Sequence, residues 1–93
     1  MELKDLQSDL LCTVHKAESL SEIDISLVNT VNVLIANNLF NWQILIFLEN
    51  LEQKLRKDSK RKLPAGKRAN VHHAIELVTV FRKVVQLKSF SLS

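Results

Sequence analysis

The 93-residue sequence contains no tyrosine and only one glycine, one proline and one cysteine. So few turn-forming residues argue against a β-sheet, and together with 46% apolar residues they favour long helices. The single cysteine, Cys12, excludes a disulfide within the chain. We expect Cys12 to be a small buried hydrophobe, because no neighbouring cation or second cysteine would activate its thiol.

Motifs for catalysis are also missing. No glycine-rich loop opens a helix, and no pair of carboxylates is placed against an apolar stretch, so we do not expect an enzyme or a small-molecule substrate. His72 and His73 would diverge by about 100° on a helix, and His15 is remote in sequence, which argues against a zinc site. We also do not expect either of these histidines to be a phosphoacceptor of the kind used by phosphotransfer bundles. We therefore expect no metal and no cofactor.

Long hydrophobic runs are absent too. The longest unbroken apolar run, Ile44 to Leu48, is far too short to span a membrane. Glu2 and Asp5 stand where a basic and then apolar leader would begin, so we expect a cytoplasmic protein. A chain of this length forms one domain, residues 1–93, with a thin core that subunit association would supplement.

The apolar residues recur at steps of three and four, which predicts an all-α fold. We expect a small antiparallel bundle of three to four helices, near residues 2–18, 22–37, 41–58 and 69–88. The amphipathic helix within residues 1–18 has a narrow apolar seam that could dock on the bundle, pair as a coiled coil or fray. Asn41 and Asn70 are candidate helix caps. The short link of about four residues, Asn38 to Asn41, should make the second and third helices antiparallel neighbours.

Two helices carry more apolar surface than one core requires. The third helix is apolar on all sides in its first turns, and the last helix has a second apolar stripe. This excess predicts a homodimer. The predicted interface residues are Trp42, Leu45, Ile46, Leu77, Val80 and Val84.

The charge is strongly asymmetric along the chain. Residues 1–53 hold two basic and eight acidic residues (net −6), whereas residues 54–93 hold eleven basic and two acidic residues (net +9). We expect an exposed basic loop at residues 58–68, which could follow DNA phosphates, meet an acidic protein or simply stay solvated. No aromatic residue accompanies these cations, which argues against single-strand recognition. No helix carries Arg, Asn or Gln spaced to reach base edges in a major groove, so any DNA contact should be weak and non-specific. The basic residues are Lys54, Arg56, Lys57, Lys60, Arg61, Lys62, Lys67 and Arg68.

Four short stretches carry a family resemblance. They are AESL at 17–20, SLVNTVNVLI at 26–35, ILIFLENLE at 44–52 and AIELVTVF at 74–81. Over about residues 17–81 the chain resembles the small bacterial two-component connector proteins of the AriR and YmgA type, which regulate biofilm formation and acid resistance. The resemblance implies an all-α dimer that binds a sensor kinase or response regulator, with accessory DNA contact and no chemistry of its own. The alternative is a bacteriocin immunity protein, another class of small, basic, antiparallel four-helix bundles.

Overall fold

The computed structural model describes residues 2–91, and this part of the chain is a bundle of four helices with no strand. The helices are α1 (Leu3–Lys16), α2 (Leu20–Ala36), α3 (Asn41–Ser59) and α4 (Ala65–Ser91). The predicted all-α fold is therefore confirmed.

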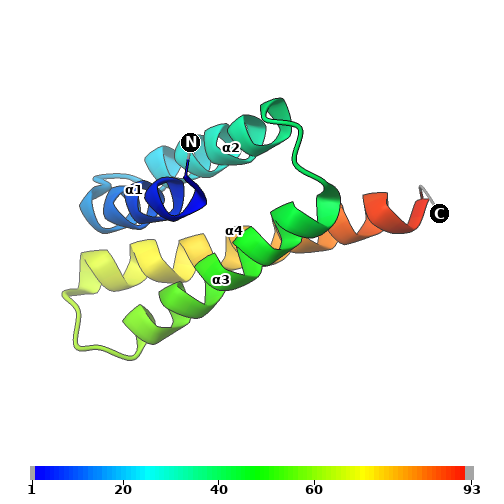
Figure 1. Ribbon diagram of the computed structural model, residues 1–93. Helices are drawn as coiled ribbons and strands as arrows, with labels where there is room; N and C mark the ends of the chain where they lie inside the picture. The colour runs from blue at the N-terminus through cyan, green and yellow to red at the C-terminus, as the bar shows by residue number, and fades with distance from the viewer. Residues whose placement is uncertain (1, 92–93) are drawn as a thin grey trace.

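The helices form two hairpins (Figure 1). The hairpin of α1 and α2 lies across the longer hairpin of α3 and α4, and α4 contacts all three other helices. The bundle measures 44 × 24 × 21 Å. Leu10 and Val14 of α1 are buried in the core, so the amphipathic N-terminal helix docks on the bundle. Docking was one of the three possibilities that its narrow seam left open.

The core follows the helical spacing of the apolar residues. Each helix buries one stripe of side chains at intervals of three and four residues, because these positions share a face. Burying one leucine or isoleucine fully contributes about 1.5–3 kcal/mol. The fully enclosed side chains come from all four helices and are Val14, Ile23, Leu27, Leu34, Leu48, Leu51, Leu55, Val71 and Val78.

The expectation that α2 and α3 pack side by side is wrong. α2 packs against α1 and α4 and makes only marginal contact with α3. After α2, Asn38 adopts a left-handed backbone with φ of 61°. The chain then crosses from one hairpin to the other before α3 begins (Figure 1). A short connection limits the distance between two helix ends, but it does not require the helices to pack along their lengths.

The expected caps are also different. Asn41 is the first residue of α3 and not its cap; Phe40 precedes the helix, and its backbone N–H donates to Oε1 of Gln43 at 2.8 Å. α4 begins at Ala65, four residues before the predicted start near residue 69, so Asn70 lies inside the helix and is not its cap. Proline is compatible with a helix start because it has no N–H to satisfy. Pro64 stands there, and its carbonyl accepts from the N–H of Arg68 at 2.9 Å.

The basic loop is shorter than predicted. α3 continues to Ser59 and α4 already includes residues 65–68, so the connection spans only residues 60–64. Cys12 is exposed, whereas we expected it to be buried. It lies two residues beyond Leu10, about 200° around α1, and therefore points away from the core that Leu10 enters.

Candidate binding surfaces

The eight predicted basic residues gather at one end of the α3–α4 hairpin, but they point in different directions. Arg56 pairs with Glu52 of its own helix at 3.3 Å, and Arg61 approaches Asp58 at 4.0 Å. Lys60, Lys62 and Arg68 are exposed around the connection. The sequence therefore predicted the cationic end correctly, but it did not predict that the cations are divided among separate surfaces. The remaining three residues, Lys54, Lys57 and Lys67, line two hollows.

Lys54 and Lys57 line a groove between α1 and α3. From α1 the groove receives Lys4, Gln7 and Ser8, and from α3 it also receives Asn50 and Gln53. Sequence reasoning missed the three carboxamides, because they lie on separate helices and match no motif. The only signal was their position on the polar faces of two helices that the fold brings together.

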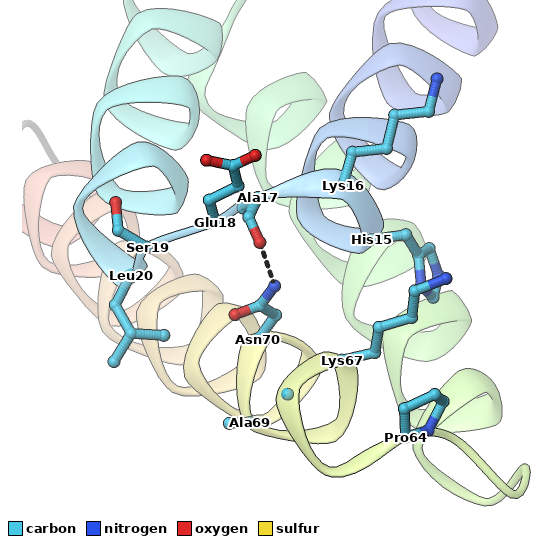
Figure 2. A pocket seen from close by; sticks show the side chains of 11 residues that line it. His15, Lys16, Ala17, Glu18, Ser19, Leu20, Pro64, Lys67, Ala69 and Asn70 are labelled. Atoms are coloured by element: carbon cyan, nitrogen blue, oxygen red, sulfur yellow. Dashed lines mark hydrogen bonds between the residues drawn. The ribbon is translucent and has the colours of Figure 1, made fainter.

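Lys67 lines an open hollow where α4 begins beneath the turn between α1 and α2 (Figure 2). The side chain of Lys67 extends toward the ring of His15. On the hollow's floor the Asn70 carboxamide donates to the carbonyls of Ala17 at 2.9 Å and Val14 at 3.1 Å. These carbonyls lie at the C-terminal end of α1, where the helix has no intrahelical donors to offer. Asn70 therefore fixes this end of α1 to α4.

A charged cluster connects α3 to α4 at mid-length. Nη1 of Arg82 donates to Oε2 of Glu52 at 3.1 Å, Nη2 donates to Glu49 at 3.3 Å, and the Thr79 hydroxyl donates to Oε1 of Glu52 at 3.0 Å. Burial would raise the pKa of Glu52. Hydrogen bonds from Thr79, Arg56 and Arg82 and the charge of Arg82 outweigh the burial and hold this pKa below its ordinary value of 4.5. The cluster stabilises the hairpin and is not arranged around an open site.

The predicted dimer-interface residues lie on two separate surfaces. Trp42 is 59% exposed and Ile46 48% exposed on the side of α3 opposite the core residue Ile44. Val80 and Val84, also exposed, lie at least about 100° around α4 from Thr79 and Arg82, the side chains that contact α3. These two valines therefore face away from α3. Two further predicted residues, Leu45 and Leu77, pack partly against the core.

Two of the three histidines are paired with carboxylates on other helices. Nε2 of His15 lies 2.9 Å from Oδ2 of Asp58, and Nε2 of His73 lies 2.6 Å from Oδ1 of Asp24. Within residues 2–91 no three or more His, Cys, Asp or Glu side chains are grouped so that they could hold a metal ion. In the same range, none of the helices combines the length and the apolar character needed to cross a membrane.

Comparison with known proteins returned no match among protein families, curated proteins or solved structures. The resemblance to the connector proteins therefore rests on the four sequence stretches alone.

Proposed function

We propose that this chain is a small non-enzymatic regulatory protein that works by binding other regulatory proteins. The observation that supports this most is the exposed apolar surface on α3 and α4. Trp42 of α3 and Val80 of α4 are each more than half exposed, although burying such apolar side chains would stabilise a small bundle. Tryptophan in particular is enriched at protein interfaces. The resemblance to two-component connectors supports sensor kinases or response regulators as the partner class of this proposal.

A homodimer is part of this proposal. The two exposed surfaces, one on α3 and one on α4, would each be covered if a second copy docked on one of them and a regulatory partner on the other. Trp42, Leu45 and Ile46 would contribute the α3 side of such contacts, and Leu77, Val80 and Val84 the α4 side. The exposed cations at the end of the α3–α4 hairpin would add weak, non-specific DNA contact as an accessory role.

A two-hybrid measurement against the sensor kinases and response regulators of the same cell tests the proposal. The expected result is binding to at least one of them, lost in Trp42→Glu combined with Ile46→Glu. Asn29→Glu is the control, because Asn29 is an exposed residue of α2 and outside both apolar surfaces. No binding to any kinase or regulator, or equal binding by the interface variant, would count against the proposal.

The second candidate is a bacteriocin immunity protein. The observation that favours it is the architecture: one chain forms four helices, arranged as two antiparallel hairpins around one core. Immunity proteins of the helical class are built in this way. Expression in a bacteriocin-sensitive strain distinguishes the two candidates. Protection against the bacteriocin would support this alternative. Unchanged sensitivity would leave the regulatory proposal as the remaining candidate.

A further inference from the structure

The helices α1 and α3 run in the same direction along most of α1 (Figure 1). His15 near the end of α1 pairs with Asp58 near the end of α3. Two adjoining hollows lie in the gap between these helices. Lys4, Gln7 and Asn50 line both hollows, so together they form one groove.

The lining of this groove is cationic and rich in amides. Three lysines and three carboxamides face it, the only other lining residue of its central part is a serine, and no carboxylate is among them. The six are Lys4, Lys54, Lys57, Gln7, Asn50 and Gln53. Such a lining favours an anionic ligand that also offers hydrogen-bonding groups.

Gln7 offers its amide to the groove from α1. The residue as a whole is only 7% exposed, and its side chain makes no hydrogen bond to any other residue of the described chain. Among the described residues only Nε of Arg82 is a buried side-chain nitrogen or oxygen without a partner, so the Gln7 amide is open to the groove. Gln7 lines both the cationic part of the groove and its other end, so its two donors and its acceptor are available to a ligand there.

One end of the groove is apolar. There Leu3 of α1 and Ile46 and Phe47 of α3 join the lining. On α3 the lining reaches from Gln43 to Lys57, which spans about 21 Å at 1.5 Å per residue. An extended peptide covers that length with about six residues. The groove thus suits a short acidic stretch that ends in an apolar side chain.

We infer that this groove binds an acidic peptide segment of a partner protein, extended, with an apolar side chain placed at Leu3 and Ile46. The inference rests on the proposed function, because it names the chemistry by which a regulatory partner is recognised. A peptide fits better than nucleic acid. The carboxamides can pair with its backbone, and the apolar end has a matching side chain, which a phosphate backbone lacks.

Fluorescence anisotropy with a labelled hexapeptide, one leucine followed by five glutamates, tests the inference. The same peptide with glutamines in place of the glutamates should bind at least tenfold more weakly. Lys54→Gln combined with Lys57→Gln should weaken binding of the acidic peptide at least tenfold. Lys60→Gln combined with Lys62→Gln is the matched control, because it removes the same charge from the same basic end outside the groove, and it should change the affinity less than threefold.

Equal losses in the two double variants would overturn the inference, because they would indicate attraction to net charge and not to the groove. Circular dichroism shows whether each variant is folded. A second readout does not depend on variants: the side-chain amide NMR signals of Gln7, Asn50 and Gln53 should shift on titration with the acidic peptide. Shifts elsewhere, or the same amide shifts with a short DNA duplex that displaces the peptide, would also overturn it.

The outcome can be separated from that of the proposed function. If the peptide fails to bind while a regulatory partner still binds and loses that binding in Trp42→Glu alone, only the groove inference is wrong. If neither binds, both are wrong.

Discussion

Nε2 of His73 in α4 lies 2.6 Å from Oδ1 of Asp24 in α2, and this pair connects the two hairpins of the bundle. A second pair also joins the hairpins: His15 of α1 meets Asp58 of α3 at 2.9 Å. Apart from the Asn70 carboxamide, these pairs are the polar side-chain contacts between the hairpins in the described chain. Apolar packing therefore contributes most of the free energy that holds the hairpins together.

Asn70→Ala should lower the free energy of unfolding by about 1–3 kcal/mol, because it removes both hydrogen bonds to the end of α1 and leaves two carbonyls unmet. Urea denaturation measures the change. Asn29→Ala, at an exposed position of α2, is the control and should stay within about 0.5 kcal/mol of the parent. A loss no larger than that of the control would show that Asn70 does not fix α1 to α4.

Glu52→Gln should make stability less dependent on pH. The pKa of Glu52 is lower in the folded chain than its ordinary value of 4.5, so its ionised form stabilises the fold. This contribution is complete above pH 4.5 and is lost as the pH falls through the lowered pKa. The parent should therefore be more stable than the variant at pH 7, and the difference should shrink in acid.

Thermal unfolding between pH 7 and pH 3 measures that difference. Glu76→Gln is the control for loss of one negative charge, since Glu76 is an exposed residue of the same hairpin. If the stability difference between the parent and Glu52→Gln increased toward acid, the prediction would be contradicted, because the Arg82 and Thr79 contacts favour the ionised form of Glu52.

Binding to a random DNA duplex should be weak and should fall steeply with salt. Each phosphate neutralised by a cation contributes about −0.9 to the slope of log affinity against log salt, so the six cations nearest the connection predict a slope between about −4 and −6. These cations are Lys57, Lys60, Arg61, Lys62, Lys67 and Arg68. No binding at about 50 mM salt would remove the accessory DNA role, and nanomolar, sequence-selective binding would contradict it as well.

The helices and their core could be predicted because they depend on local spacing. Leu27 and Leu34 recur on one face of α2, and Leu48, Leu51 and Leu55 on one face of α3, and all five are buried. A stripe of this kind has to be buried whatever the helix packs against, so its period is visible in the sequence.

What could not be predicted depends on which helices meet. Asn70 resembled a helix cap because asparagine favours that position, but its carboxamide is held by carbonyls 53 and 56 residues away. Likewise, Gln7 and Asn50 are unremarkable polar residues until α1 and α3 lie side by side. The apolar surplus on α3 and α4 was visible in the sequence, whereas its division between two faces was not.

Site-specific photo-crosslinking in living cells tests the central claim most directly. A photoreactive amino acid in place of Trp42 should give one crosslinked product, either a homodimer or a complex with a sensor kinase or response regulator, because Trp42 is 59% exposed on the apolar surface of α3. The same amino acid in place of Asn29 is the control and should give neither product. Absence of both products at position 42, or equal products at the two positions, would contradict the account of this surface as a protein interface.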